Sequence, residues 1–481
     1  MGNSIKKLLI ANRGEIAVRI ARTAADMGIT TWAIYPEDDA QSLHTRMTDS
    51  AVAIAGIGAA AYLDSTAIIN AAREVGCDAI HPGYGFLSEN AAFASSCHDA
   101  GLTFVGPRPE TLALFGDKAK ARAFATQHNV PVVPGTSGAT TYDEAHVFMS
   151  SLGRNAAVMV KAIAGGGGRG MRPVTNSEQL ADAMERCSSE ALQSFGNSDV
   201  YVEQLFSRVR HIEVQIIGDG TGAVTHLWER ECSLQRERQK ILEMAPAPFL
   251  RPAIRARLLQ AATNLAVASQ YLNAGTFEFL VDAADDSDDA AIAFIEANVR
   301  LQVEHTVTEE ITGVDLVQAQ LEIAAGRHLA DLQLGQQDIA PPTGLAIQAR
   351  VNLETMQPDG SVRSGGGTIN VYEPPSGRGV RVDGYGYAGY STNPRYDSLL
   401  AKVIVHAATN SFADAAAKAE RALSEFRVSG APSNITFLRA LLKDPSILAG
   451  SMHTRYIDEN VGALIDAEPE TGRYFELPSA N

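Results

Sequence analysis

Residues 296–304 of this chain alternate strictly between polar and apolar side chains. The even positions carry Glu296, Asn298, Arg300, Gln302 and Glu304, and the odd positions carry alanine, valine or leucine. Successive side chains of an extended chain point to opposite faces, so the five polar groups would share one face over roughly 26 Å. A half-exposed strand with a solvated face is the simplest interpretation, but such strands usually carry Thr, Lys or Ser. Two carboxylates, a guanidinium and two amides, preceded by the apolar run 290–295, instead predict a buried strand that runs out into a polar cleft.

The composition favours a soluble globular chain of two or three domains. Its 481 residues are 45% hydrophobic and 20% charged, which is enough to form a large core. The formal charge of -16 opposes binding to nucleic acid or anionic lipid over any broad surface. Four cysteines without a Cys-x-x-Cys pair suggest neither a zinc site nor a disulfide framework. We therefore expect a cytoplasmic protein that is not attached to a membrane and has no targeting segment.

The N-terminal region alternates between patterns typical of strands and of helices. We expect strands at 7–11, 31–35 and 79–80, and helices at 15–27 and 64–75. This order predicts a parallel, doubly wound sheet. Residues 12–15 fall at the first strand-to-helix turn, where ligands of open α/β sheets tend to bind. Residues 81–89, rich in glycine and proline, are interpreted most simply as a turn in which Ser88 caps the next helix.

A glycine-rich loop follows a predicted domain boundary at 131–135. The short apolar strand 158–161 ends in Lys161, and four consecutive glycines and Arg169 come soon after it. Consecutive glycines let main-chain N–H groups approach a phosphate closely, although a flexible hairpin would use the same residues. The spacing matches neither the P-loop nor the dinucleotide-binding fingerprint, so neither of those folds is implied.

Two further strand pairs are expected in the second half of the chain. Residues 211–217 and 223–227 read as a hairpin around the turn 218–220. Residues 275–281 and 291–296 read as two strands joined by the acidic run 282–289, which we interpret as a solvated loop. Pairing of these strands would place Glu278 beside Glu296. Two adjacent carboxylates repel unless a cation lies between them, and Mg²⁺ prefers a few carboxylates together with substrate phosphate oxygens.

Six segments in order, 12–17, 81–90, 165–171, 231–235, 275–279 and 296–305, resemble the motifs of biotin carboxylases, a family of the ATP-grasp superfamily. The resemblance extends from about residue 5 to about residue 460. It implies an ATP-grasp fold of mixed α/β and α+β class, with a doubly wound N-terminal domain at 1–116 and a linker at 117–136. A mobile lid would span 137–205, an antiparallel-sheet domain 206–460, and a tail 461–481.

The resemblance also implies a site for ATP and for Mg²⁺ or Mn²⁺. The residues that match the family's metal ligands are Glu278, Glu296 and Asn298. Those that match its nucleotide contacts are Lys118, Lys161, Gly165, Gly166, Gly167, Gly168, Met171, Glu203, Leu205, His211, Gln235 and Leu280.

The matching catalytic residues are Lys240, Arg300, Gln302, Val303, Glu304 and Arg350. In such enzymes the first three and the Val303 amide would surround bicarbonate, and Glu304 would be the general base. Attack of bicarbonate on the γ-phosphate would give carboxyphosphate, and Arg350 would stabilise the enolate-like oxygen of biotin. One departure is Arg238, where the family commonly has histidine; we interpret it as altered nucleotide or partner contacts.

No Met-Lys-Met biotinylation sequence is present, so biotin is expected on another chain or segment. The implied partners are a biotin carboxyl carrier protein or domain and a carboxyltransferase, and a homo-oligomer is expected. Residues 364–368, 385–390 and 393–402 look most like those of acyl-CoA carboxylases. Pyruvate and urea carboxylases use the same half-reaction and remain alternatives.

Two other classes of function compete with this interpretation. One is a catalytically silent relative that binds nucleotide and organises a complex. The other is an ATP-grasp ligase that joins a carboxylate to an amine through an acyl phosphate. The complete row 296–304, together with Lys240 and Arg350, argues against both.

Overall fold

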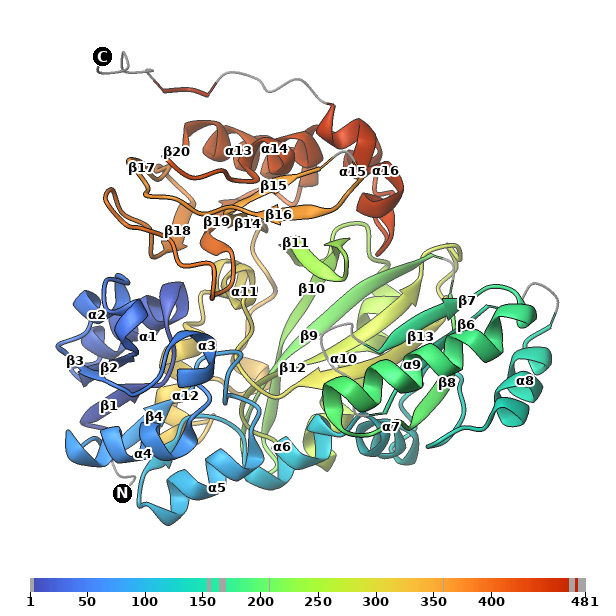
Figure 1. Cartoon of the computed structure of the whole chain (residues 1–481), viewed down its shortest axis with the longest axis horizontal. Coiled ribbons are helices and arrows are strands. Elements are labelled where there is room, and N and C mark those ends of the chain that lie inside the picture. The colour runs from blue at the N-terminus through green and yellow to red at the C-terminus, as the bar shows by residue number, and fades with distance from the viewer. Residues whose placement is uncertain are drawn as a thin grey trace.

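The computed structural model describes residues 4–153, 157–163, 170–206, 208–357, 359–466 and 472–474. Figure 1 shows an N-terminal α/β unit at the lower left, a small three-stranded unit at the right, and a large sheet between them. The C-terminal helices lie along the top. None of the helices in these ranges is both long enough and apolar enough to cross a bilayer.

The N-terminal unit is a parallel five-stranded sheet in the order β3-β2-β1-β4-β5, which confirms the predicted doubly wound arrangement. Its strands are β1 (Lys7–Ile10), β2 (Thr30–Tyr35), β3 (Ser50–Ala53), β4 (Ala79–His81) and β5 (Thr103–Phe104). Its helices are α1 (Gly14–Asp26), α2 (His44–Met47), α3 (Gly58–Ala61), α4 (Ser65–Glu74), α5 (Ala91–Asp99) and α6 (Pro109–Gly116).

Side-chain caps fix where the helices of this unit begin. The Asp64 side chain accepts a hydrogen bond from the Ala67 amide at the start of α4. At the start of α5 the cap is Asn90, which accepts from the Phe93 amide. The expected capping by Ser88 is therefore wrong, because the helix starts at Ala91 and its cap lies two residues after Ser88.

The small unit is an antiparallel sheet in the order β7-β6-β8, built from β6 (Val158–Ala162), β7 (Met171–Val174) and β8 (Val200–Gln204). Helices α8 (Tyr142–Ser151) and α9 (Leu180–Phe195) cover it, and Val160, Leu180 and Cys187 lie in its core. Helix α7 (Lys118–Gln127) precedes it. Gly165, Gly166, Gly167 and Gly168 of the predicted phosphate loop lie outside the described residues.

The large sheet is antiparallel throughout, in the order β13-β12-β9-β10-β11-β14-β19-β18. Its strands are β9 (Val209–Asp219), β10 (Val224–Arg236), β11 (Gln239–Ala245), β12 (Leu272–Asp282), β13 (Ile292–Asn298), β14 (Leu345–Asn352), β18 (Val380–Gly384) and β19 (Leu399–Ala407). Both predicted strand pairs, 211–217 with 223–227 and 275–281 with 291–296, are present in it.

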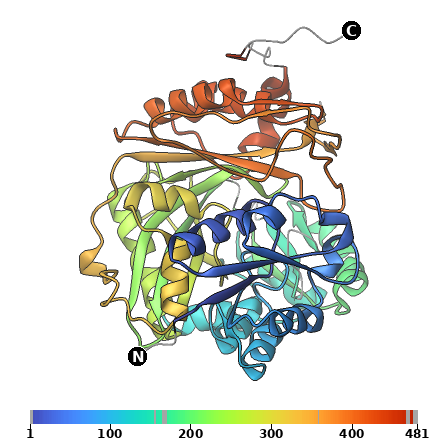
Figure 2. The ribbon, with the colours of Figure 1, turned by 90° about the vertical axis from the view of Figure 1, so that its left-hand side faces the viewer.

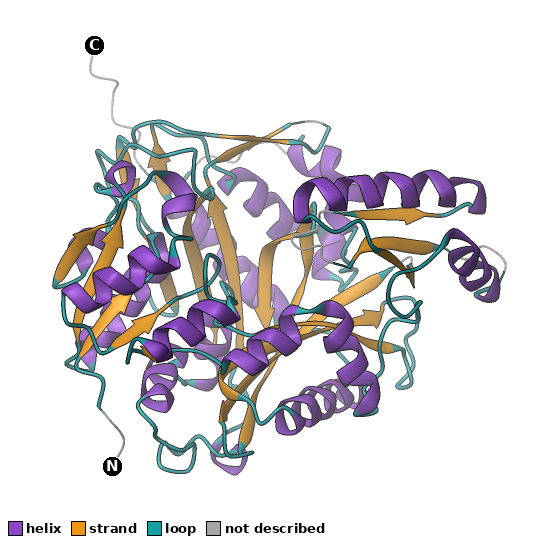
Figure 3. Cartoon of the chain, turned by 60° about the horizontal axis from the view of Figure 1, so that its bottom comes forward, coloured by secondary structure: helices purple, strands orange, loops and turns teal. Residues whose placement is uncertain are grey.

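Helices cover the large sheet from outside, and Figure 3 shows its strands running through the middle of the molecule. Helix α10 (Pro252–Ala268) packs on β9 and β10, and α13 (Phe412–Glu425) packs on β14 and β19. Figure 2 shows the N-terminal unit in front of this sheet and beneath the C-terminal layer.

The remaining α-helices are α11 (His305–Thr312), α12 (Leu316–Ala324), α14 (Ile435–Lys443), α15 (Pro445–Leu448) and α16 (Tyr456–Ile465). The remaining strands are β15 (Glu354–Met356), β16 (Val362–Ser364), β17 (Val371–Glu373) and β20 (Arg427–Ser429).

The expectation of one extended strand over 296–304 is wrong in its second half. Strand β13 ends at Asn298, and Glu304 is already the N-cap residue of α11. Val299 is buried with the core beneath the large sheet, whereas Leu301 is buried with Leu8 and Ile10 of the N-terminal unit. The chain leaves the sheet because these apolar side chains belong to two different cores.

A close contact on β12 gives a test of packing in the large sheet. A Cβ atom at Gly275 would lie 1.8 Å from the hydroxyl oxygen of Tyr271, a fully buried side chain. We expect Gly275→Ala to lower the free energy of unfolding by about 1–3 kcal/mol, as overpacking of a core does. The matched control is Gly462→Ala on α16, where a Cβ would meet nothing within 4 Å. The control should stabilise by roughly 0.5–1 kcal/mol. Equal urea midpoints for the two variants would contradict this account.

Candidate active site

A cavity of about 580 Å³ lies where the N-terminal unit, the large sheet and the C-terminal layer meet. The N-terminal unit contributes residues 12–15 and 84–86, and the C-terminal layer contributes residues 395–399. Ten of the residues predicted from the sequence line it: His211, Lys240, Glu278, Glu296, Asn298, Arg300, Gln302, Val303, Glu304 and Arg350. The polar row 296–304 therefore does face a cleft, although only its first three residues belong to a strand.

The ammonium of Lys240, on β11, contacts three carboxylates. Its Nζ lies 2.5 Å from Glu213, 3.1 Å from Glu278 and 2.5 Å from Glu304. Burial alone would lower the pKa of Lys240, but the three carboxylates raise that pKa well above its usual value. Lys240 therefore stays charged, and it holds together carboxylates that would otherwise repel.

Glu304 lies between two cations. Its carboxylate accepts hydrogen bonds from Lys240 and, at 3.0 Å, from Arg350 on β14. Burial opposes ionisation of Glu304, but Lys240 and Arg350 lower its pKa below the usual range of a carboxyl group. Arg350 also donates to Glu243 at 2.5 Å, so its guanidinium is fixed from two sides.

Arg230 on β10 lies beneath the cavity and holds several of its polar residues in place. Its guanidinium is fully buried and donates hydrogen bonds to five side chains, those of Glu213, Gln215, Thr276, Gln302 and Thr308. The bond to Gln302 spans 2.8 Å and leaves the amide nitrogen of Gln302 to donate to Glu278 at 2.7 Å. Arg230 thus fixes both Glu213, which holds Lys240, and Gln302.

Glu278 and Glu296 are directly opposite each other in the pairing of β12 with β13, as the sequence predicted. The side-chain amide of Asn298 donates to Glu278 at 2.6 Å, and the Glu296 side chain is 40% exposed with Lys118 Nζ 3.6 Å away. A hard cation with oxygen ligands fits this pair, because Glu296 is still free to turn toward a phosphate-bound ion.

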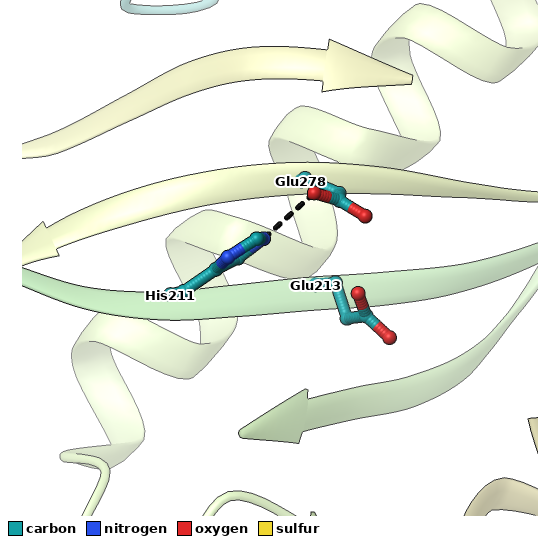
Figure 4. A group of neighbouring side chains, drawn as sticks. All are labelled: His211, Glu213 and Glu278. Atoms are coloured by element: carbon teal, nitrogen blue, oxygen red, sulfur yellow. Dashed lines mark hydrogen bonds and ion pairs between the residues drawn. The ribbon is translucent and has the colours of Figure 1, made fainter. Parts of the chain in front are cut away.

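His211, Glu213 and Glu278 also have ligand atoms within 4.8 Å of one another (Figure 4). His211 Nε2 lies 2.7 Å from Glu278, and Gln235 donates to His211 Nδ1 at 2.7 Å. Burial lowers the pKa of His211, but Glu278 more than offsets this and raises the pKa above its usual value. Since both oxygens of Glu213 are engaged by Arg230 and Lys240, this group is internally satisfied and fits a metal less well than Glu278 with Glu296.

Of the predicted nucleotide residues that the structure describes, only His211 lines the cavity. Lys161 pairs with Glu203, which also accepts from Arg122 at 2.9 Å. The Leu205 amide donates to the carbonyl of Ala157 at 2.8 Å. Met171 pairs with Lys161 across β6 and β7, and Leu280 pairs with His211 across β12 and β9.

Sequence reasoning missed Glu213, Arg230, Glu243, Glu15 and Lys402, all of them buried charged residues. A signal existed for Glu213, because the alternation of 211–217 places it on the same face as His211 and Gln215. No comparable signal marked Arg230. Its strand, β10, is rich in polar residues and yet mostly buried, so its sequence does not show which polar side chains lie inside.

Three family models match the chain in succession. The N-terminal domain of biotin carboxylase matches residues 4–112, and the ATP-binding domain of the carbamoyl-phosphate synthase L chain matches 117–332. The C-terminal domain of biotin carboxylase matches 348–459.

Solved structures and curated sequences agree with the family models. The biotin carboxylase domain of a single-chain bacterial carboxylase is 48% identical, with a TM-score of 0.85 over 96% of this chain and 98% of that one. The biotin carboxylase domain dimer of Hydrogenobacter thermophilus 2-oxoglutarate carboxylase, solved with MgADP, ADP and bicarbonate, is 40% identical. Its TM-score is 0.90, over 97% of this chain and 100% of that one. Human mitochondrial pyruvate carboxylase is 49% identical over 461 residues, which are 95% of this chain but 38% of that protein.

The parallel N-terminal sheet, the three-stranded unit and the antiparallel sheet with its charged cavity together define an ATP-grasp ligase fold. Within that class the chain belongs to the biotin carboxylase family. It spans less than half of the length of the curated pyruvate carboxylase that it matches.

The buried position of Arg230 predicts a large effect on stability. Arg230→Met should lower the free energy of unfolding by about 3–5 kcal/mol, because Glu213 would remain buried without its guanidinium partner. The control is Arg186→Met on α9, where Arg186 and Asp182 form a pair with both side chains 64% exposed. That change should cost less than about 0.5 kcal/mol. Urea unfolding followed by circular dichroism measures both, and similar midpoints would show that Arg230 is not structurally central.

Proposed function

We propose that this chain carries out the biotin carboxylase half-reaction, in which ATP and bicarbonate carboxylate a carrier-bound biotin through carboxyphosphate. The convergence of Lys240, Glu304 and Arg350 in one buried cavity carries the proposal. Such a cluster suits a small anion that must be held, deprotonated and brought to a phosphoryl group. It is supported by the bicarbonate and MgADP in the 2-oxoglutarate carboxylase domain, which shares the fold.

The bicarbonate would bind among Lys240, Arg300, Gln302 and the Val303 amide. While Lys240 and Arg350 both donate to Glu304, its lowered pKa makes that carboxylate a weak base. We propose that bicarbonate takes over the hydrogen bond from Lys240. The pKa of Glu304 would then rise, so that Glu304 becomes able to accept the bicarbonate proton only when the substrate is in place.

Phosphoryl transfer would follow between groups that the sheet holds. The deprotonated bicarbonate oxygen attacks the γ-phosphorus, the bond to the β-phosphate bridging oxygen breaks, and ADP leaves. Glu278 and Glu296, with Asn298, would hold Mg²⁺, which supplies charge neutralisation at the phosphates.

The nucleotide would be bound by two further groups of residues. Lys118 and Lys161 would contact its phosphates. The residues around the nucleoside would be Glu203, Leu205, Gln235, His211, Leu280 and Met171. Residues 137–205 would form the lid, with Gly165, Gly166, Gly167 and Gly168 at the phosphates.

Carboxyphosphate would then break into CO₂ and phosphate, and the phosphate would accept the N1′ proton of biotin. The biotin nitrogen would attack CO₂, while Arg350 stabilises the negative ureido oxygen. Arg350 is well placed for both halves, because it lines the cavity and contacts the proposed base, Glu304. The partners would be a biotinylated carrier and a carboxyltransferase, and a second copy of this chain would form a dimer as in the 2-oxoglutarate carboxylase domain.

For the final acceptor we propose a small 2-oxo acid such as pyruvate. The segments 364–368, 385–390 and 393–402 resemble those of acyl-CoA carboxylases and predict an acyl-CoA acceptor. The 49% identity to human pyruvate carboxylase and the likeness to a 2-oxoglutarate carboxylase domain favour the alternative instead. Assay of the whole carboxylase with pyruvate, 2-oxoglutarate and acetyl-CoA decides between these acceptors.

The half-reaction predicts a simple pattern of ATP turnover. ATP hydrolysis should require bicarbonate and Mg²⁺, and its rate should rise when free biotin is added, because carboxyphosphate is consumed faster. The measurement is phosphate release with each component omitted in turn. A rate that is independent of bicarbonate and unaffected by biotin would refute the proposal.

The proposed base gives a sharper test. Glu304→Gln should reduce bicarbonate-dependent ATP hydrolysis by roughly 10²-fold or more, because the amide cannot accept the proton. Nucleotide affinity, measured by calorimetry with ADP, should be retained. Glu310→Gln is the matched control, since Glu310 lies about 1.7 turns further along α11 and is absent from the cavity wall. A near-normal rate in Glu304→Gln would remove Glu304 from the mechanism.

A further inference from the structure

The segments 12–15 and 81–89, which the mechanism leaves without a role, are fixed to each other beside the cavity. The Asn12 side-chain amide donates to the carbonyl oxygens of Pro82, at 2.7 Å, and Tyr84, at 2.8 Å. The Tyr84 hydroxyl in turn donates to the carboxylate of Glu15. These contacts hold Glu15, in the first turn of α1, with its side chain directed into the interior.

The partner of Glu15 is Lys402 on β19, a lysine whose side chain is fully buried. Lys402 Nζ lies 3.1 Å from Glu15 and donates a hydrogen bond to the carbonyl oxygen of Val303 at 3.0 Å. Asp383 faces Lys402 in the pairing of β18 with β19. An ammonium buried without such partners would cost several kcal/mol, so Glu15, Asp383 and the Val303 carbonyl together keep Lys402 inside.

Lys402 and Arg350 act on consecutive residues of the same segment. They are directly opposite each other in the pairing of β14 with β19. Arg350 contacts the side chain of Glu304, and Lys402 contacts the main-chain carbonyl just before it. Because a peptide group is planar, fixing the Val303 carbonyl fixes the peptide that leads into Glu304. The orientation of that peptide group in turn determines where the Glu304 side chain points.

We propose that Lys402, anchored by Glu15 and Tyr84 of the N-terminal unit, is a positioning residue for the bicarbonate-binding segment 299–304. Through this chain of contacts the N-terminal unit helps to determine the geometry of the proposed base. The inference rests on the proposed function for what the segment binds, but the contacts themselves make a separate prediction about how rigidly the segment is held.

The test compares Lys402→Met with the double variant Glu15→Gln/Lys402→Met. The single change leaves Glu15 buried without its cation and should destabilise the fold, whereas the double change leaves no uncompensated charge on this pair. In the double variant we expect the KM for bicarbonate to rise roughly tenfold or more, the effect of losing one hydrogen bond to a charged group. The KM for ATP should stay within about twofold, a split that a general loss of stability would not produce.

The matched control is Glu420→Gln/Arg439→Met, which removes an ion pair between α13 and α14 whose side chains are 12% and 11% exposed. That pair lies outside the cavity wall, and its removal should leave the KM for bicarbonate unchanged. A folded Glu15→Gln/Lys402→Met variant with the bicarbonate KM of the natural protein would overturn the proposal.

Hydrogen exchange separates this inference from the proposed function, because it requires no activity. Amides of residues 299–307 should exchange faster in the Glu15→Gln/Lys402→Met variant, and amides of β6 and β8 should not change. Unchanged exchange in 299–307 would overturn the positioning role. If the natural protein shows no bicarbonate-dependent ATP hydrolysis, the proposed function fails, and the exchange result alone then decides whether Lys402 positions this segment.

Discussion

The structure depends on one row of charges that crosses the large sheet. Glu296, Glu278, Glu213 and Arg230 face one another on four successive strands, β13, β12, β9 and β10. Three neighbouring carboxylates on one face repel, and buried charges without partners cost several kcal/mol each. Arg230 and Lys240 of β11 each contact Glu213 at 2.5 Å, Lys240 also contacts Glu278, and the half-exposed Glu296 has Lys118 3.6 Å away. The row is therefore stable only when all five strands hold their register.

That requirement explains how the sheet separates packing from chemistry. Alternate residues of β9 and β12 point to opposite faces, so Ile212, Val214, Phe277 and Phe279 pack in the core with residues of α10. The charged row lies on the other face, where its members Glu278 and Glu296 line the cavity. A slip of one residue in either strand would send carboxylates into the apolar core and apolar side chains into the cavity. Packing of the apolar face therefore fixes the positions of the charged side chains on the other face. Pairing of those charges in turn disfavours any other register of the strands.

The sequence allowed much of this arrangement to be predicted, and the failures have physical causes. The strand pairs and the opposition of Glu278 and Glu296 followed from period-two alternation, which the structure confirms. The end of β13 at Asn298 could not be predicted, because it depends on Leu301 joining a core built from residues nearly three hundred positions earlier. Arg230 and Lys402 were missed for a related reason. Local patterns describe a lysine or arginine as surface charge, and only the tertiary placement of Glu213 and Glu15 makes their burial possible.

The same reasoning bears on Arg238, the departure from the family pattern. Glu237 and Arg238 form the two-residue connection between β10 and β11, and both have positive φ, 47° and 68°. Two-residue hairpins require this conformation, which non-glycine residues adopt at some cost, so the tip of the hairpin is fixed by the strands on either side. Arg238 and Lys240 are two residues apart and both line the cavity. A histidine at 238 would lose its charge near pH 6.5, whereas an arginine keeps its charge and presents a planar fork suited to phosphate. The change therefore puts a guanidinium where the family commonly has an imidazole, at the tip of the hairpin whose second strand carries Lys240 to the cavity.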